Sequence, residues 1–324
     1  MLRVLAAAVA VALVQPAPPG PTAPPAREIA PGTTLVPGAM LPDRGPDGNT
    51  VILDAPDGLV VVDTGRHAWH SDAIAAVARA RQRPIAAIVN THWHLDHSSG
   101  NVRLKAAFPA ARLYTTSAVI GALAPGGFIA RNLAAARERP PETHPLRREE
   151  TAIFLATMET PDALRPDVAI DTTGERRIAG RPLSIHVTDG AVSAADIWLY
   201  DGATGVAILG DLVTVPAPFF ETACPARWEA ALDQVRATPF RLAVPGHGPP
   251  MTRDEFDVYR TAFAAFRGCA AGDGAASACA EAWTRAITAF LPEDADRRQA
   301  TQYAAYYVDF LRKNGGASPD CAAR

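Results

Sequence analysis

Short runs of hydrophobic residues, separated by turn-forming residues, follow one another from residue 50 onward. Residues 50–53 and 59–62 are apolar and β-branched, and the Ala-Pro-Asp-Gly step between them predicts a hairpin. A helical pattern follows at 71–83, with Ser71 as a candidate N-cap. The apolar run 85–89 then predicts a buried strand, which leads directly into the segment Thr-His-Trp-His-Leu-Asp-His at 91–97.

The same alternation of strand and helix patterns continues to residue 252. Further strands are expected at 113–115, 168–170, 183–187, 197–200, 206–209 and 242–244, with a helix at 226–236. Residues 121–165 are richer in Arg, Glu, Pro and Ala and carry helical stretches at 129–139 and 149–158, which indicates an insertion. Strands followed by a helix, in two halves, predict two sheets packed face to face with helices outside.

The two ends of the chain differ from this central region. Residues 1–26 contain an early Arg3, an apolar run at 4–14 and a Pro- and Ala-rich stretch, which is the layout of a signal peptide and the start of a linker. The main domain is expected at 34–252, and the helical patterns at 254–266, 280–290 and 295–311 form a C-terminal extension at 253–324. We therefore expect a periplasmic or secreted protein without a membrane segment in its mature form.

Four cysteines lie in the proposed mature chain, and an even number in an exported protein indicates disulfides. Cys269 and Cys279 bracket a Gly/Ala/Ser-rich loop between two helical patterns, so they are the preferred pair. Cys224 either pairs with Cys321 or stays free. None of the four has the spacing of a zinc ribbon.

Composition limits the classes of partner. The chain of 324 residues is 48% hydrophobic and 20% charged, with a net charge of −3, and is typical of a globular protein. No Lys/Arg-dense stretch provides the basic surface of a nucleic-acid-binding protein. A small-molecule substrate is expected, and nothing in the composition indicates an oligomeric state.

The segment at 91–97 concentrates potential metal ligands. His92, His94, Asp96 and His97 lie within six residues, directly after a buried strand. Several nitrogen and oxygen donors on one short loop can converge on a single point, as zinc requires. Histidines two residues apart share a face of an extended segment, while Asp96 and His97 turn toward a second position. The segment therefore predicts two adjacent metal positions.

His92-x-His94-x-Asp96-His97 after a strand resembles the defining motif of the metallo-β-lactamase superfamily. Gly210-Asp211 resembles the family's metal-bridging aspartate step, and Gly246-His247-Gly248 resembles its final histidine step, in family order. The resemblance implies a four-layer αββα sandwich of the α+β class, with His92 and His94 at one zinc and Asp96, His97 and His247 at the other. Asp63, in the Val-Asp-Thr-Gly step at 62–65, is expected to be structural or to support a ligand.

One position departs from the family pattern. Members usually carry another histidine just before the strand that precedes the bridging aspartate, and an alignment without gaps places Val192 there. Valine cannot bind zinc. His186 and Asp189 lie slightly upstream and are possible substitute ligands. One or two zinc ions are expected, and the same donors accept iron or manganese.

The implied chemistry is hydrolysis by a metal-bound hydroxide of an ester, lactone, thioester or amide bond, a class that includes β-lactams. Asp96 would be catalytic because it both binds metal and orients the hydroxide. Asp211 stands where one subgroup of family lactamases has a cysteine, which argues against that subgroup. Two alternatives stay open: an iron-dependent oxidoreductase like the sulfur dioxygenases of this fold, and a non-catalytic binding module with a degraded metal site.

Overall fold

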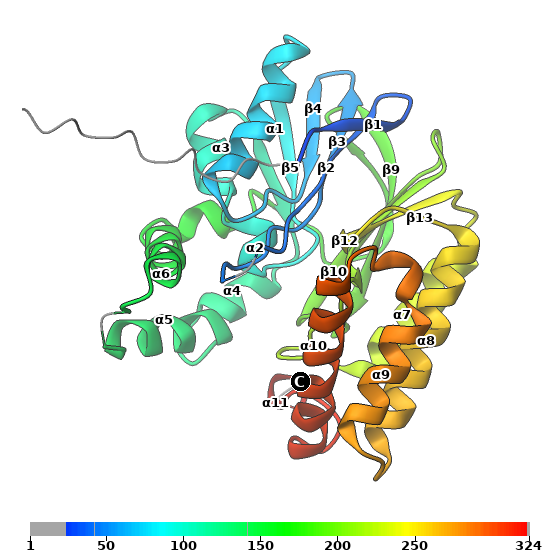
Figure 1. The fold of residues 1–324 in the computed structure, drawn as a ribbon. Helices are drawn as coiled ribbons and strands as arrows, with labels where there is room; N and C mark the ends of the chain where they lie inside the picture. The colour runs from blue at the N-terminus through cyan, green and yellow to red at the C-terminus, as the bar shows by residue number, and fades with distance from the viewer. Residues whose placement is uncertain (1–23, 42, 141, 323–324) are drawn as a thin grey trace, which may run out of the picture.

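The computed structural model describes residues 24–41, 43–140 and 142–322. The predicted signal peptide lies almost entirely outside these residues. The remainder forms two sheets between two layers of helices, drawn as a ribbon in Figure 1. This arrangement confirms the α+β sandwich with C-terminal helices that the sequence predicts.

The first sheet has seven strands in sequence order. They are β1 (Arg27–Ala30), β2 (Thr33–Val36), β3 (Thr50–Ala55), β4 (Gly58–Val62), β5 (Ile85–Val89), β6 (Arg112–Thr115) and β7 (Val168–Ala169). The strands from β1 to β4 pair antiparallel, whereas β4 to β7 pair parallel. The carboxyl ends of β4 and β5 therefore meet at one edge of the sheet, where the segment at 91–97 begins.

The second sheet has six strands in the order β13-β12-β11-β10-β9-β8. They are β8 (Gly174–Ile178), β9 (Arg181–Asp189), β10 (Ala195–Asp201), β11 (Val206–Thr214), β12 (Leu242–His247) and β13 (Met251–Thr252). Only β11 and β12 pair parallel among these strands. Their parallel pairing, with a register shift after Ile208, brings Asp211 of β11 and His247 at the end of β12 to the same edge.

Three cores separate the layers. Leu53, Val62 and Val89 of the first sheet pack against Ile197 and Val244 of the second, in one buried cluster between the sheets. The outer face of the first sheet is covered by α1 (Ala68–Ala80) and α3 (Asn101–Ala107). The outer face of the second is covered by helices that include the C-terminal extension: α7 (Pro225–Ala237), α8 (Arg253–Ala271), α9 (Ala276–Ala286) and α10 (Asp294–Lys313). The extension therefore packs as a structural layer.

The insertion forms a separate helical group beside the first sheet, visible around α4, α5 and α6 in Figure 1. Its elements are α4 (Ala118–Leu123), α5 (Phe128–Glu138), α6 (Pro145–Met158) and a 3-10 turn at Pro161–Leu164. Their small core includes Ile129 and Met158 and is built on Trp93, which lies between the first two histidines of the motif. The insertion is thus anchored directly on the metal-binding segment.

The segment Ala118–Glu138 is long and apolar enough to cross a membrane by length and composition, a candidate that the sequence analysis did not identify. In the structure this segment is two helices, α4 and α5, interrupted between Leu123 and Phe128. Ile129 of α5 is buried against Trp93. The segment therefore forms part of the insertion.

Two local expectations need correction. Ser71 is not an N-cap, because α1 begins earlier, with His67 at its N-cap. The backbone N–H groups of Arg66 and His67 instead donate to the Asp47 carboxylate at 2.7 and 2.9 Å, so a distant residue caps this helix. The first sheet also begins before residue 34, because β1 and β2 extend it into the segment that looked like a linker.

Both disulfides are present. Cys269 and Cys279 are bridged, as predicted, and connect the end of α8 to α9. Cys224 pairs with Cys321, which resolves the alternative that the sequence left open. This second bridge connects the start of α7 to α11 (Pro319–Ala322).

Candidate metal centre

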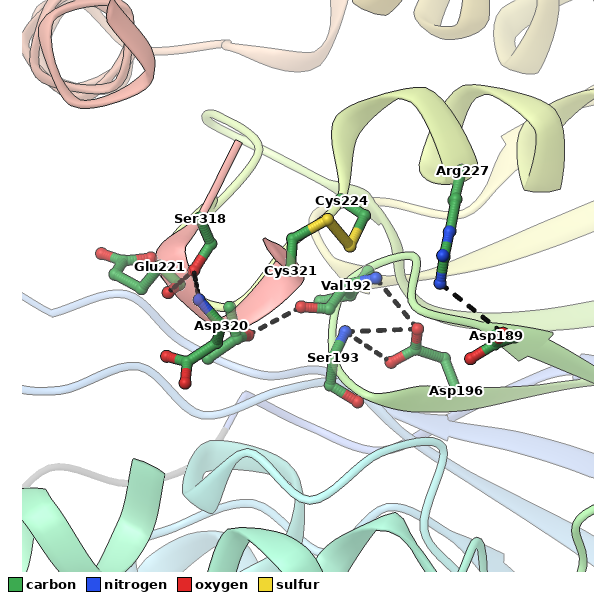
Figure 2. The surroundings of a disulfide bond; sticks show 11 residues. Asp189, Val192, Ser193, Asp196, Glu221, Cys224, Arg227, Ser318, Asp320 and Cys321 are labelled. Atoms are coloured by element: carbon green, nitrogen blue, oxygen red, sulfur yellow. Dashed lines mark hydrogen bonds and ion pairs between the residues drawn. A yellow bond between two sulfur atoms is a disulfide. The ribbon is translucent and has the colours of Figure 1, made fainter. Parts of the chain in front are cut away.

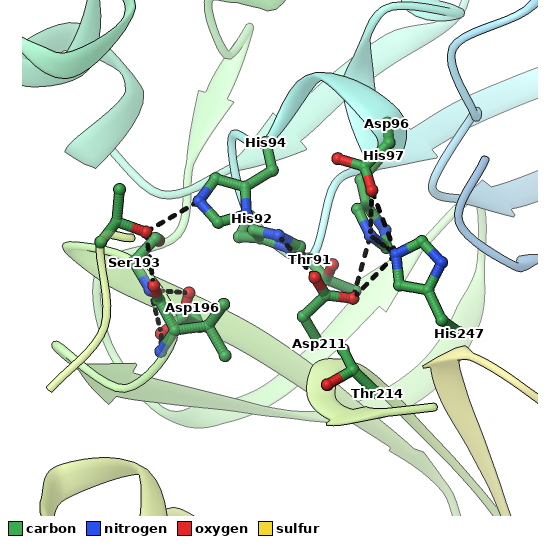
Figure 3. A network of polar contacts seen from close by, with 12 residues as sticks. Thr91, His92, His94, Asp96, His97, Ser193, Asp196, Asp211, Thr214 and His247 are labelled. Atoms are coloured by element: carbon green, nitrogen blue, oxygen red, sulfur yellow. Dashed lines mark hydrogen bonds and ion pairs between the residues drawn. The ribbon is translucent and has the colours of Figure 1, made fainter. Parts of the chain in front are cut away.

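The predicted ligands converge where the two sheets meet. The segment after β5 carries four of them, Asp211 lies in β11, and His247 ends β12. The sheets are joined here by the Ile197 N–H, which donates to the Thr91 carbonyl at 2.6 Å, and by Asn49, whose side chain donates to the carbonyls of Pro245 and Gly248 at 2.9 Å. Figure 3 shows the ligands facing one another from these elements.

Asp96, His97, Asp211 and His247 form one cluster, which we call the complete group because it offers four ligand atoms within 4.8 Å of one another. The His97 Nε2 lies 3.0 Å from the Asp211 Oδ1 and 3.2 Å from the His247 Nε2. The His247 Nε2 lies 3.0 Å from the Asp96 Oδ2. Two imidazoles and two carboxylates are a donor set that suits zinc.

His92, His94 and Asp211 form a second cluster, which we call the open group because it has three ligands. The His92 Nε2 lies 3.6 Å from the Asp211 Oδ2. Asp211 offers its Oδ1 to the complete group and its Oδ2 toward His92, which is the geometry of a bridging carboxylate. Three protein ligands that leave a coordination position free are typical of catalytic zinc sites.

Asp63 and Thr91 orient two of the histidines, as expected for a residue that supports ligands. The Asp63 Oδ2 lies 2.8 Å from the His97 Nδ1 and accepts a hydrogen bond from the Thr91 hydroxyl at 2.8 Å. Because that hydroxyl has donated its hydrogen, its oxygen accepts from the His92 Nδ1, 3.0 Å away. The Nε2 atoms of both rings are left facing the ligand groups, and hydrogen bonds of this kind are what fix metal-binding histidines.

Thr222 performs the same role for His94, and sequence reasoning did not identify it. Its hydroxyl donates to the Val192 carbonyl at 2.7 Å, so its oxygen accepts from the His94 Nε2, 2.8 Å away. The Nδ1 of His94 is then the unprotonated nitrogen that is available to a metal. Thr222 lies 128 residues after His94, and no sequence motif marks it.

Two glycines are required by close contacts. A side chain at Gly246 would place its Cβ 2.1 Å from the Asp211 Oδ1. Gly210 has a φ of 52°, and a Cβ there would lie 2.5 Å from the Thr91 Oγ1. These contacts explain the Gly-Asp and Gly-His steps in which Asp211 and His247 occur, because larger residues would displace the ligands.

The donor atoms fit a bound cation. The His92 Nε2 and the Asp211 Oδ2 are buried and make no hydrogen bond among the described residues. Unpartnered buried polar atoms are costly unless a ligand satisfies them. Burial lowers the pKa of His92, which keeps the ring neutral. Although burial opposes the charge, the Asp211, Asp63 and Asp96 carboxylates raise the pKa of His97 well above its usual value, so the complete group attracts positive charge.

The two candidate substitute ligands are placed elsewhere. His186 stacks on Trp198 with ring centroids 3.7 Å apart, and Asp189 is exposed and paired with Arg227 at 3.5 Å. Neither joins a converging ligand group among the described residues. Val192 is buried, and its backbone N–H donates to Asp196 at 2.9 Å. Nothing at this position replaces the missing histidine, so the open group keeps three ligands.

A cavity of about 940 Å³ opens over the ligands. His94, Asp96 and Asp211 line it, so the metal centre faces this space. One wall is apolar and comes from the insertion: Phe128, Ile129, Phe154 and Leu155. Phe219, Glu221 and two α10 tyrosines, Tyr303 and Tyr307, also line the cavity, together with Arg66, Arg139 and Arg148. An apolar wall beside metal ligands suits a substrate with an apolar part and a polar scissile bond.

A buried ion-pair cluster fixes the insertion beside the cavity. His67 lies 2.8 Å from the Asp47 Oδ2 through its Nδ1 and 2.7 Å from the Glu150 Oε1 of α6 through its Nε2. Burial alone would lower the pKa of His67, but hydrogen bonds to Asp47 and Glu150 raise it above its usual value. Arg66 adds an ion pair to Glu150 at 3.3 Å. The position of α6, and with it the apolar wall, is therefore linked to the end of the first sheet.

Fold and site together define a protein with two sheets between helical layers and candidate metal-ligand groups at the shared edge of the sheets. The family model of the metallo-beta-lactamase superfamily matches residues 43–247, and the chain belongs to this superfamily. Within this superfamily fold, the chain carries His and Asp clusters that could hold metal ions.

Known proteins of two kinds resemble the chain. A linear primary-alkylsulfatase of Pseudomonas sp. (strain ATCC 19151) is 28% identical over 232 residues, which are 63% of this chain and 42% of the relative. The chain thus spans less than half the length of this relative. A stereoselective inverting sec-alkylsulfatase from Pseudomonas sp. superposes with a TM-score of 0.55 at 18% identity, covering 89% of this chain and 50% of that one. A metallo-beta-lactamase from Pontibacter korlensis gives a TM-score of 0.51 at 17% identity, covering 73% and 95%.

Proposed function

We propose that this chain is an exported zinc-dependent hydrolase that cleaves an ester-type bond in a substrate with an apolar part. The observation that carries the proposal is the position of the two ligand groups, which share Asp211 at the base of a cavity with an apolar wall. Carboxylic esters, lactones, thioesters and amides remain in the substrate class. The alkylsulfatase relative adds sulfate esters to it.

Asp96, His97, Asp211 and His247 would hold one ion, and His92, His94 and Asp211 a second. Such ions, when bound, supply hydroxide near neutral pH from water and stabilise negative charge that develops on the substrate. Asp63, Thr91 and Thr222 each contact one ring nitrogen of His97, His92 and His94, so that the other nitrogen of each ring faces the ligand groups. Asp96 would orient the attacking water as well as bind metal.

The cavity wall favours an amphiphilic substrate. Phe128 and Phe154 of the insertion offer apolar contact beside the ligands, and Arg66 lines the same space. Burial alone would raise the pKa of Asp96, but the charges of His97 and His247 lower it. The Arg66 guanidinium adds a smaller decrease. Arg66 would therefore attract an anionic group close to the scissile bond.

Export is supported by the disulfides. All four cysteines are paired within the described residues, and disulfides persist in oxidising compartments. Two cross-links fit a periplasmic or secreted protein whose residues 1–26 act as a signal peptide. The N-terminal sequence of the protein recovered from the periplasm or medium tests this, because an intact Met1 would contradict export.

The activity is tested with the purified mature chain on a panel of dodecyl sulfate, 4-nitrophenyl butyrate, a fatty-acyl lactone and a chromogenic cephalosporin. We expect hydrolysis of at least one ester, its loss on treatment with a chelator, and its recovery on addition of zinc. Activity that survives complete metal removal would contradict the proposal. Cleavage of the cephalosporin alone would overturn the preference for esters.

A further inference from the structure

The segment between β11 and α7 places a carboxyl group on the cavity wall. Glu221 lines the same cavity as Asp96 and Asp211. Its backbone carbonyl accepts a hydrogen bond from the Ser318 hydroxyl at 2.6 Å. The Cys224–Cys321 disulfide joins this segment to α11, as Figure 2 shows, with Glu221 beside Ser318. The backbone that carries the carboxyl is thus fixed from two sides.

The side chain of Glu221 is fixed as well. The Tyr307 hydroxyl of α10 donates to the Glu221 Oε1 at 2.6 Å. Among the described residues, the hydrogen bond from another side chain to this carboxyl is made at Oε1, which leaves Oε2 for a molecule in the cavity. The carboxyl is also outside both ligand groups. Its position on the wall, one oxygen held and the other available, is the arrangement of a proton donor rather than of a metal ligand.

The surroundings favour the protonated form. Burial raises the pKa of the Glu221 carboxyl, and the negative charge of Asp96 adds to the increase. Hydrogen bonds from Tyr307 and from the backbone of Glu221 itself lower the pKa and only partly offset this increase. A carboxyl that keeps its proton in a cleft beside a reaction centre suits general acid catalysis.

We propose that Glu221 is the general acid that protonates the leaving group, an inference that rests on the proposed hydrolase function. As the bond from the acyl carbon or sulfuryl sulfur to the leaving oxygen breaks, its electron pair stays on that oxygen, which takes the proton from the Glu221 Oε2. Water supplies the hydroxyl group that replaces the leaving group. The remaining proton of that water returns to the Glu221 carboxylate, so each turnover consumes one water and restores the acid.

The assignment predicts a dependence on the leaving group. An alkoxide is a strong base and needs a proton to depart, whereas 4-nitrophenolate is a weak base and departs without one. Glu221→Gln should therefore lower kcat/KM for an alkyl ester by about 10²- to 10⁴-fold and leave the 4-nitrophenyl ester within about threefold of the wild type. Glu221→Asp, which keeps an acid, should recover part of the alkyl activity.

The experiment measures kcat/KM and bound metal for the wild type, Glu221→Gln and Glu221→Asp. The substrates are hexyl and 4-nitrophenyl butyrate, and dodecyl and 4-nitrophenyl sulfate. Glu281→Gln is the matched control, because Glu281 is exposed on α9. Selective loss of alkyl ester activity with unchanged metal content supports the proposal.

Three outcomes overturn it. Equal loss on the alkyl and 4-nitrophenyl esters would mean that Glu221 supports the structure only. Loss of metal from Glu221→Gln would make this residue a metal ligand. If the wild type cleaves none of the four substrates, the proposed hydrolase function fails for these esters, and the role of Glu221 fails with it. Failure of the Glu221 role alone is recognised by a wild type that is active.

Discussion

The complete group and the open group share Asp211 but differ in what surrounds them. The complete group has four ligands, and Asp63 orients His97 within it. The open group has three, and Val192 stands where the sequence alignment with the family pattern expects a further histidine. The backbone of Val192 is used instead, since its carbonyl accepts from Thr222, which in turn orients His94.

This difference would let one group hold its metal ion tightly while the other keeps a coordination position open. Four protein ligands close a tetrahedral site and favour tight binding, whereas three leave a position for water or substrate. The complete group would therefore retain its ion and the open group would bind more weakly and exchange ligands. The open group also includes His94, which lines the cavity.

The largest effect is expected at the shared ligand. Asp211→Ala removes a carboxylate from both groups, so metal content should fall and kcat/KM should drop by about 10³-fold, equivalent to about 4 kcal/mol of transition-state stabilisation. Elemental analysis and steady-state kinetics measure both. Asp309→Ala, on the exposed face of α10, is the control. Full metal content in Asp211→Ala would contradict a bridging role.

Replacing one histidine at a time should show which group binds metal more tightly. His247→Ala should weaken the tighter of the two metal-binding events by at least about 100-fold, because one of four ligands is lost. His94→Ala should affect only the weaker event. Competition with a metal indicator resolves the two events, and exposed His144→Ala serves as the control. If His94→Ala weakens the tighter event instead, the ranking of the groups is reversed.

Thr222 tests the open group through its hydrogen bond. Thr222→Val keeps the shape but cannot accept from the His94 Nε2, so the weaker metal affinity should fall by about 10- to 100-fold. Thr222→Ser keeps the hydroxyl and should behave like the wild type. The same metal titration measures both variants. Equal affinity for the valine and serine variants would show that His94 does not depend on this contact.

The smallest effect is a gain of binding. Val192→His supplies an imidazole next to the contact between Thr222 and His94 and should raise the affinity of the open group by about tenfold. Val192→Leu keeps an apolar side chain and is the control for packing. Metal titration, with thermal unfolding to confirm the fold, measures the difference. A histidine variant that binds no better than the leucine variant would place residue 192 outside ligand distance.

The ligands could be predicted because they follow strands that are themselves regular. The run after β5, Asp211 in β11 and His247 at the end of β12 are local signals, and parallel pairing then brings them together. Thr222 and Glu221 could not be predicted, because their roles depend on contacts with His94 and Tyr307 that lie 128 and 86 residues away.

The first two strands and the N-cap of α1 were also predicted wrongly because they depend on contacts with distant residues. Residues 27–33 lie outside the domain predicted at 34–252, yet β1 pairs with β2, and β2 pairs with β3, so both belong to the first sheet. Ser71 has the residue type of an N-cap, but the Asp47 carboxylate binds the N–H groups at the start of α1 instead. In each case the local sequence allows more than one backbone conformation at similar energy, and a contact with a residue distant in sequence stabilises the observed one.

The number of zinc ions bound per mature chain tests the central claim most directly. Elemental analysis after dialysis against trace zinc should give about one tightly held ion, and free zinc in excess should raise this to about two, as expected for a complete and an open group. Asp211→Ala should lower both values. A mature, folded chain that retains no metal under either condition would contradict the account.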